Sequence, residues 1–469
     1  MNNIIKNFFY QASYQVLLIF LPIITVPIVS RALGPTGVGT WNYINSILTY
    51  FTLVAGLGLS NYGVREIALV RKSKNLSMKF WELQLFNCSF GILIVFIYIL
   101  FCLFVPKEHK MLYFIQGFAL LGSLFDVTWF FGGLEQFKQI TIRSFIVKII
   151  SFVLIILLVK KESDLVIYFY IQSLSVMISE ASLWFFIKGK INFCMPKVRD
   201  IYKHFKPALS FFIPKISQTI YFNLTKTILG LMTSMAIVGY YSNANLLIKM
   251  VTTIILSLNT VLLPRMTSYY GDRSYEKMIL LLRRTIDFQL FLTIPMSFGI
   301  VAINSKMINW FFGPDFAPLE SIVPILAPIV VLQTLHSGIA TQYLVPTGNI
   351  KSYNFSAIMA AIISVILNVT LIPLVGIYGA SISYLFSQIV LVITRAFSLK
   401  KNTQFKFEWK NIIKYVFSAL LMYFVIFLST QNMSSSFVTT LTQIFLGIFV
   451  YALLTAILKV NPLILYLKK

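Results

Sequence analysis

The stretch Pro207–Arg265 reads PALSFFIPKISQTIYFNLTKTILGLMTSMAIVGYYSNANLLIKMVTTIILSLNTVLLPR. It holds two long apolar runs with a short separator, and about 20 apolar residues are enough for one helix to cross a bilayer. Three lysines, Lys215, Lys226 and Lys249, lie inside these runs. Because a charge at the bilayer centre costs about 3 to more than 10 kcal/mol, these lysines are candidate functional residues.

The whole chain has the composition of a membrane protein. Of its 469 residues, 58% are hydrophobic and only 12% are charged, and long apolar runs with few charges are typical of transmembrane proteins. We predict an all-α integral membrane protein of about fourteen transmembrane helices, the first of them a true span and not a removable signal peptide. The spans are expected to begin near Tyr10, Thr40, Trp81, Met111, Thr141, Asp164, Pro207, Met235, Thr285, Glu320, Tyr353, Gly379, Ile412 and Phe437.

The distribution of basic residues predicts the orientation of the chain. Apart from the three intramembrane lysines, the remaining cations fall into two unequal sets of alternate loops. One set and the two termini carry 30 of the 39 lysines and arginines. This excess predicts that both termini lie in the cytoplasm, and it explains the net charge of +24 by topology, with no nucleic-acid partner. The opposite loops carry Arg31, Lys107, Lys110, Lys160, Lys161 and Lys306.

Weak internal similarity predicts two related lobes. VGTWN at Val38–Asn42 and VGYYS at Val238–Ser242 are 200 residues apart, and each is followed by an asparagine. Because six spans separate the matching segments, the repeat is parallel, as in exporters that work by alternating access. The expected division is an N-terminal lobe at 1–187, a cytoplasmic linker at 188–206, a C-terminal lobe at 207–397 and a two-helix appendage at 412–458.

Catalytic and cofactor motifs are missing from the sequence. It contains no phosphate-binding lysine loop, dinucleotide-binding glycine set or HExxH pair. The longest outer loop, about 304–320, is too short for a catalytic domain, and Cys88, Cys102 and Cys194 are expected to be free thiols. We therefore expect a transporter without a cofactor, and no enzyme.

The intramembrane cations predict an anion-binding site. Lys215 and Lys226 are eleven residues apart, about 20° beyond three helical turns, so both point the same way. With Lys249 and with Arg31 at the outer end of the first span, they are expected to line a water-filled cavity that binds a phosphate or pyrophosphate head group. For Lys226 and Arg31 the alternative is contact with the outer interface, and for Lys215 and Lys249 it is pairing with an acid or backbone carbonyls.

Two acidic residues, Asp126 and Glu180, lie in the fourth and sixth spans. A carboxylate inside the membrane can carry a proton or coordinate sodium, so both are candidates for ion coupling or for a polar cavity. The alternative is a structural ion pair with Arg143 or Lys148 in the fifth span.

Five segments of the chain resemble those of bacterial polysaccharide repeat-unit flippases, members of the MATE-like (multidrug/oligosaccharidyl-lipid/polysaccharide) exporter superfamily. They fall in order along the first twelve spans, and the last two spans contribute little. The segments are RALGPTGVG at 31–39, DVTWFFGGLE at 126–135, VGYYSNAN at 238–245, VLLPR at 261–265 and PLVGIYGA at 373–380.

The resemblance implies a flippase of the bacterial cytoplasmic membrane, embedded in membrane lipid. Its implied cargo is undecaprenyl-diphosphate-linked oligosaccharide, moved from the inner to the outer leaflet for capsule, exopolysaccharide or related surface polysaccharide. Proton or sodium is the implied coupling ion, and polysaccharide polymerase and glycosyltransferases are the implied partners. The chain has Thr225 and Gln388 where the family often has acids. The alternatives are a multidrug exporter of the same fold and a polytopic membrane glycosyltransferase or polymerase.

Overall fold

The computed structural model describes the backbone of residues 2–467, and within this range all side chains except those of 2–19, 213–214, 217–218, 220–222, 260 and 465–467. The described chain is helical and contains no strand. Its helices form two compact units, Met1–Thr227 and Ile228–Lys469. The predicted all-α membrane protein fold is confirmed.

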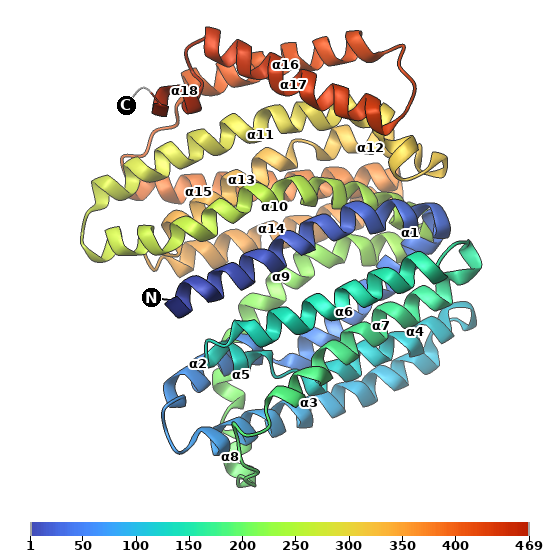
Figure 1. The fold of residues 1–469 in the computed structure, drawn as a ribbon, viewed down its shortest axis with the longest axis vertical. Coiled ribbons are helices and arrows are strands. Elements are labelled where there is room, and N and C mark those ends of the chain that lie inside the picture. Colours follow the sequence, from blue (N-terminus) through green and yellow to red (C-terminus); the bar gives the residue numbers. More distant parts are fainter. Residues whose placement is uncertain (1, 468–469) are drawn as a thin grey trace. The chain divides into compact units, whose positions relative to one another are not determined.

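In the described residues of unit 1, five helical segments are long and apolar enough to cross a membrane, and most of α9 joins them (Figure 1). Within it, α3 packs on α4, α4 on α7 and α7 on α6. The helices are α1 (Asn2–Gly56), α2 (Leu59–Val70), α3 (Leu76–Phe104), α4 (Lys107–Gly122), η1 (Ser123–Phe125), α5 (Thr128–Gly133), α6 (Phe137–Leu158), η2 (Glu162–Asp164), α7 (Leu165–Ser182), η3 (Leu183–Phe186), α8 (Val198–Tyr202) and α9 (Phe205–Met232), the last as far as Thr227.

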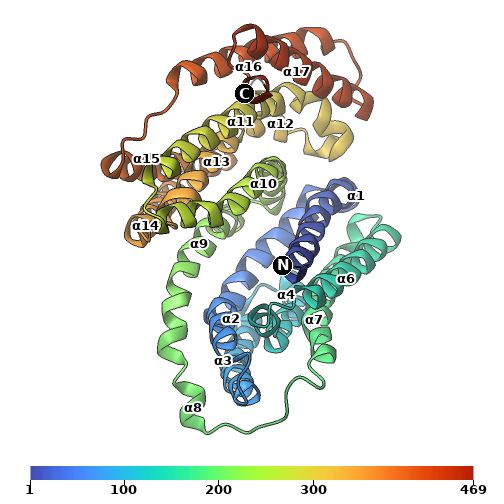
Figure 2. The same cartoon turned by 60° about the vertical axis from the view of Figure 1, so that its left-hand side comes forward.

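In unit 2, α14 and α15 pack as an antiparallel pair, and α16 and α17 pack along α11 (Figure 2). The two last spans are joined to α11 through Tyr415, which donates a hydrogen bond to Asp287. The helices are α10 (Met235–Gly271), α11 (Tyr275–Phe311), η4 (Pro314–Phe316), α12 (Leu319–Leu326), α13 (Ile329–Ile339), η5 (Ala340–Leu344), α14 (Ile350–Val375), α15 (Ile377–Asn402), α16 (Trp409–Thr430), α17 (Phe437–Ile457) and α18 (Pro462–Leu467).

Twelve helical segments of the described chain are long and apolar enough to cross a membrane. They account for thirteen of the expected spans, because the segment Phe20–Val70 contains the spans expected near Tyr10 and Thr40. The remaining expected span, which begins near Pro207, is α9, where several side chains lie outside the described set. The chain is therefore a multi-pass membrane protein.

The first two expected spans join at Gly34 and Pro35, a residue pair typical of a turn. The helical backbone of α1 breaks there at Gly34 (φ 61°, ψ 179°), and the chain turns back (Figure 1). A left-handed φ of this kind costs glycine little, and proline tolerates the first position after a helix break. The two spans thus join through a kink.

The contacts divide the chain inside α9 and not in the segment 188–206. The start of α9 lies against α2, where a Cβ added at Gly58 would meet Ala208 O at 2.6 Å and Phe212 N at 2.8 Å. A glycine with positive φ (75°) allows this close approach of two backbones. The functional lobe boundaries expected from the sequence remain a prediction.

Candidate functional site

A cavity of about 350 Å³ lies within unit 1 and brings together three of the predicted site residues, Asp126, Glu180 and Lys215. Its volume is within the range of about 300–1,000 Å³ that is usual for ligand pockets. The wall comes from α1, α2, α3, α4, η1, α7 and α9. The lining residues are Thr49, Thr52, Leu53, Gly56, Leu59, Ser60, Asn87, Ala119, Ser123, Asp126, Val176, Glu180, Lys215 and Thr219.

The fourth span is broken where it meets this cavity. Helix α4 ends at Gly122, one turn of 3-10 helix follows as η1, and Asp126 has an extended backbone (φ −63°, ψ 113°) before α5 begins at Thr128. Inside a membrane such irregular backbone occurs where it is buried in protein or lines a water-filled cavity. The break therefore indicates that this part of the fourth span faces protein or a cavity and not lipid.

Side chains from three other elements satisfy the carbonyl groups that the break releases. Asn87 Nδ2 donates to Ser123 O at 3.0 Å, and Gln84 Nε2 donates to Leu124 O at 2.7 Å. The indole N–H groups of Trp184 and Trp129 donate to the next two carbonyls, those of Phe125 and Asp126, at 2.9 Å each. Four consecutive carbonyls thus have side-chain partners, which keeps the buried backbone hydrogen-bonded.

The Asp126 carboxylate stabilises the start of α5. Its Oδ1 accepts hydrogen bonds from the Thr128 backbone N–H at 2.8 Å and from the Thr128 hydroxyl at 2.5 Å. This is the bonding of an Asx turn, in which the carboxylate satisfies the backbone N–H two residues on, at the first residue of α5. Asp126 Oδ2 makes no hydrogen bond to any described side chain or backbone group, so this oxygen remains available in the cavity.

Glu180 makes the ion pair that the sequence offered as its alternative. Arg143 Nη1 lies 3.0 Å from Glu180 Oε2 and also donates to the Ser179 carbonyl. The Arg143 side chain is 5% exposed, whereas Glu180 is 23% exposed and lines the cavity. Losing one member of a buried pair leaves an uncompensated charge, so this pair fixes α6 against α7.

Both lysines of α9 contact the α1–α2 segment. Lys215 Nζ donates to Ser60 Oγ at 3.1 Å, beside the acids of the cavity. Lys226 Nζ donates to Asn42 Oδ1 at 3.0 Å. The sequence assigned Lys215 to the C-terminal lobe and the acids to the N-terminal one, but in the structure Lys215, Asp126 and Glu180 line one cavity.

The other two predicted cations lie elsewhere. Arg31 is exposed on α1, three residues before the break at Gly34. Lys249 is exposed on α10 in unit 2, and its ammonium group makes no hydrogen bond or ion pair with a residue that the structure describes. Neither residue lines the cavity of unit 1.

Charges in the unit 1 site are close to balanced. Asp126 and Glu180 face Lys215 in the cavity, and Arg143 neutralises Glu180 from behind. In a region of low dielectric constant such groups interact several-fold more strongly than in water. Among the described residues no group of three or more histidine, cysteine, aspartate or glutamate side chains could hold a metal ion.

A buried polar cluster anchors the start of α9 to the rest of unit 1. His204 lies directly before α9, and its Nε2 is 3.0 Å from Glu82 Oε2 of α3 while its Nδ1 is 2.6 Å from the Tyr62 hydroxyl of α2. Lys79 and Lys203 also bind Glu82, at 2.8 and 3.1 Å. Burial lowers the pKa of His204 more than Glu82 raises it. The neutral imidazole, with its proton on Nε2, fits both neighbours.

Sequence reasoning missed the neutral residues of this site. Gln84 and Asn87 lie one turn apart in an apolar span, and so do Thr49 and Thr52. Polar pairs at this spacing share one helix face, which is the signal that would have placed them toward a polar interior. The role of Glu82 and His204 was also missed, because they are 122 residues apart.

A family model described as polysaccharide biosynthesis protein matches residues 4–270, more than half of the chain and all the elements of the unit 1 site. The chain belongs to this family. Among its relatives, a protein of Escherichia coli (strain K12) provisionally named an O-antigen transporter is 23% identical over 413 residues, which cover 85% of this chain and 97% of that protein. A flippase assigned to low-salt glycan biosynthesis in Haloferax volcanii is 25% identical over 49% of this chain and 48% of its own length.

Solved structures with the same fold are exporters. The lipid II flippase MurJ in an inward closed conformation aligns with a TM-score of 0.75 at 17% identity, covering 97% of this chain and 98% of that one. An inward-facing multidrug resistance MATE transporter of the MOP superfamily aligns with a TM-score of 0.63 at 13% identity, covering 84% and 99%. The expected MATE-like fold is therefore confirmed by these structures, and membership of the polysaccharide biosynthesis family by the family model.

Proposed function

We propose that this protein is a flippase that moves lipid-linked oligosaccharide from the inner to the outer leaflet of the bacterial cytoplasmic membrane by alternating access. The observation that carries the proposal is the unit 1 cavity, which is lined by Asp126 of a broken membrane helix, Glu180 of α7 and Lys215 of α9. Relatives named as an O-antigen transporter and a glycan flippase support the cargo class. We infer transport and not catalysis, for the assembly of surface polysaccharide such as capsule or exopolysaccharide.

The proposed lipid carrier is undecaprenyl diphosphate. Lys215 binds its phosphate oxygens by releasing Ser60, since an ammonium group forms stronger hydrogen bonds to an anion than to a neutral hydroxyl. Lys249, an exposed cation of unit 2, supplies a second contact. Lys226 and Arg31 are proposed to act later, toward the outer leaflet, where the cargo leaves.

Asp126 is the proposed coupling group. Its Oδ1 is held by Thr128, and its Oδ2 is available to take up a proton or a sodium ion. Binding of either cation neutralises the cavity and resets it after the anionic cargo has left. An inside-negative potential also favours outward movement of an anion, by about 2.3 kcal/mol per charge per 100 mV.

Under this proposal both termini lie in the cytoplasm, because the loops that carry most of the basic residues then face inward. The cytoplasmic face is where glycosyltransferases would complete the cargo. Polysaccharide polymerase would use the cargo on the outer face. These enzymes are the proposed partners.

The direct test is transport by Lys215→Gln and Lys249→Ala proteins in vesicles loaded with lipid-linked oligosaccharide, together with polymer export in cells. Lys107→Gln, which removes an exposed lysine at the start of α4, is the matched control. We expect transport to fall at least about tenfold for Lys215→Gln, the loss of about 1.4 kcal/mol of cargo binding, and to stay normal for the control. Normal transport by both lysine variants at unchanged protein levels would disprove the cargo role.

The two carboxylates of the cavity favour a second function, export of organic cations by the same fold. Dye efflux from cells separates the two. If cells expressing the protein export cationic dyes while lipid-linked oligosaccharide stays in the inner leaflet, the multidrug function is correct and the flippase proposal is wrong.

A further inference from the structure

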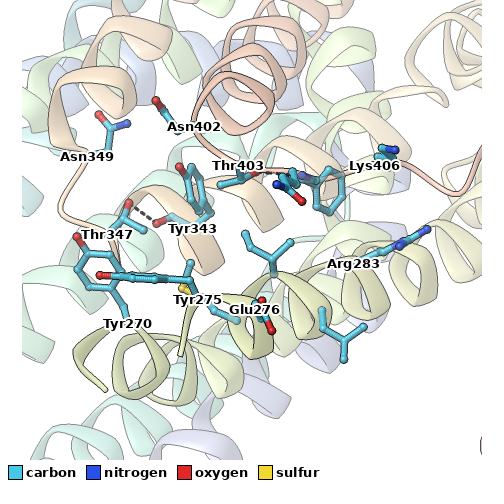
Figure 3. Close-up of a pocket in the computed structure, with 15 residues that line it drawn as sticks. Tyr270, Tyr275, Glu276, Arg283, Tyr343, Thr347, Asn349, Asn402, Thr403 and Lys406 are labelled. Carbon is cyan, nitrogen blue, oxygen red and sulfur yellow. Dashed lines mark hydrogen bonds between the residues drawn. The ribbon is translucent and has the colours of Figure 1, made fainter. Parts of the chain in front are cut away.

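Unit 2 contains a second, larger cavity of about 1010 Å³ (Figure 3). It lies where three chain connections meet: the turn from α10 to α11, the turn from η5 to α14, and the non-helical segment 403–408 that follows α15. The sequence predicts all three connections on the cytoplasmic side, so this cavity opens at the inner membrane surface under the proposed orientation. It shares no lining residue with the cavity of unit 1.

Two tyrosines form one side of this cavity. Tyr270 and Tyr275 follow each other across the α10–α11 turn, with ring centroids 5.6 Å apart and ring planes at 64°. They are 36% and 49% exposed, so part of each ring is accessible to a ligand. Figure 3 shows them on the opposite side of the cavity from Asn349, Asn402 and Thr403. The two tyrosines thus face a wall of amide and hydroxyl groups, among which Tyr343 also lies.

The polar wall is made mostly of uncharged groups. Asn402 and Gln404 are exposed amides, and Thr347 and Thr403 contribute hydroxyl groups. Amide and hydroxyl side chains both donate and accept hydrogen bonds, as do the hydroxyl groups of a sugar. The apolar C–H faces of a sugar ring also pack well on an aromatic ring, so the two walls match the two kinds of surface on a saccharide.

Charges around the cavity argue against a purely anionic ligand. Arg283 is already paired with Glu408, and the Glu276 carboxylate also lies in the wall. Lys406 is the one lining cation that makes no hydrogen bond or ion pair with a described residue. A neutral or weakly acidic sugar needs no cation besides Lys406, and the amide and hydroxyl groups of the wall can hydrogen-bond to its hydroxyls.

We propose that this cavity binds the saccharide part of the lipid-linked cargo at the cytoplasmic surface. The inference rests on the proposed function. The volume is at the upper end of the range for ligand pockets, which suits several linked sugars and not a single small ion. At the ends of the membrane helices, hydrated sugars bind in the cavity while the lipid tail of the same molecule remains in the bilayer.

Binding of the free saccharide to the full-length protein in lipid nanodiscs tests this inference. The probe is the oligosaccharide released by mild acid from the lipid-linked pool of the producing cells, and its affinity is measured by calorimetry. Tyr275→Ala and Asn402→Leu are expected to weaken binding about tenfold, since a tyrosine that packs on a ligand contributes more than 1 kcal/mol. Tyr275→Phe keeps the ring and is expected to bind like the unchanged protein.

Two further samples separate this inference from the proposed function. Lys215→Gln, in the other cavity, is expected to bind the free oligosaccharide normally although its transport falls. Inorganic pyrophosphate is expected not to compete with the oligosaccharide. The inference is wrong if the unchanged protein does not bind the probe, if Tyr275→Ala and Asn402→Leu bind it as tightly as the parent, or if pyrophosphate displaces it. Absent transport by the unchanged protein, together with binding that Tyr275→Ala weakens, would overturn the proposed function alone.

Discussion

The segment Lys107–Gly133 of unit 1 and the segment Leu319–Leu344 of unit 2 occupy the same place in the repeat that the sequence predicts, and both depart from a regular α-helix. In unit 1 the helix breaks fully, and Asp126 adopts an extended backbone beside a cavity. In unit 2 the chain keeps its helical path and widens into one π-helical turn, η5 (Ala340–Leu344). A π-turn shifts the hydrogen-bond register without opening the backbone.

The polar partners of the two segments also differ. The carbonyls of the unit 1 break accept hydrogen bonds from Gln84, Asn87 and two tryptophans, and a carboxylate lies among them. In unit 2 the partners of η5 are neutral amides: Gln342 and Gln289 both donate to Asn259 Oδ1, at 2.7 Å each. One turn before η5, the buried Arg395 also donates to His336 O, at 3.1 Å. The difference indicates that the unit 1 segment presents a carboxylate to a cavity, whereas the arginine and the amides of unit 2 are bonded within the helix packing.

Removing the arginine behind the unit 1 cavity is the change with the largest expected effect on stability. Arg143→Leu leaves Glu180 without its partner in a largely buried position, which costs about 3–5 kcal/mol for a buried pair. Unfolding of the purified protein in detergent measures the loss. Lys138→Leu, an exposed position at the start of the same helix, is the control and should unfold like the parent. Equal stability of the two variants would show that the pair does not hold α6 against α7.

Loss of a carbonyl partner at the break has a smaller effect. Gln84→Leu leaves Leu124 O with only the weak thiol donor of Cys88, at 3.6 Å, and should lower the free energy of unfolding by about 1–2 kcal/mol. Transport should fall with it, because the break loses its fixed geometry. A variant that is destabilised but transports at the parent rate would contradict a functional role for the break.

The same substitution in unit 2 should cost less. Gln342→Leu removes one of two donors to Asn259, but it also removes Gln342 Oε1, a buried oxygen with no hydrogen-bond partner among the described residues. The two effects offset each other, so we expect a change within about 1 kcal/mol and normal transport. The free energy of unfolding and the rate of vesicle transport of Gln342→Leu, each compared with those of Gln84→Leu, check the two expectations. If Gln342→Leu lost transport, the claim that only the unit 1 segment takes part in transport would be wrong.

The smallest expected effect is a pH dependence that arises from the cluster at the start of α9. Burial holds the pKa of His204 below its ordinary value of 6.5, and Lys79 and Lys203 add to this, while Glu82 opposes it. The unfolded chain therefore binds the proton more readily, so stability is complete above about pH 6.5 and decreases as the pH falls through the lower folded pKa. Unfolding midpoints between pH 7 and pH 5 should fall for the parent and less steeply for His204→Gln. Parallel curves would exclude His204 as the cause.

Much of the fold was predictable from the sequence, because a bilayer imposes long apolar runs that hydropathy detects. Every expected span corresponds to helix in the structure. The pair Gly34-Pro35 does not by itself give the length of the connection, which in the structure is a break at a single residue between two helices.

Of the residues that form the unit 1 site, the sequence identified only the charged ones. Asp126, Glu180 and Lys215 are conspicuous in apolar sequence, and the structure brings them to one cavity. Besides the local bonds from Thr128 and Trp129, the break depends on donors such as Gln84 and Trp184, which are about 40 and 60 positions away and cannot be paired with it from the sequence. The position of Lys215 could not be inferred either, since it follows from the packing of α9 on α2.

The account depends most on the charge of Asp126, and transport by Asp126→Asn tests it most directly. Asparagine keeps an oxygen that can accept from Thr128, so the start of α5 should persist and only the charge is lost. The rate of lipid-linked oligosaccharide transport into vesicles is compared for Asp126→Asn and Gln342→Leu at equal protein levels. We predict that Asp126→Asn is slowed about tenfold or more, the effect of about 1.4 kcal/mol, while Gln342→Leu transports at the parent rate. Parent-rate transport by Asp126→Asn, or equal slowing of both variants, would contradict the assignment of charge handling to the broken helix of unit 1.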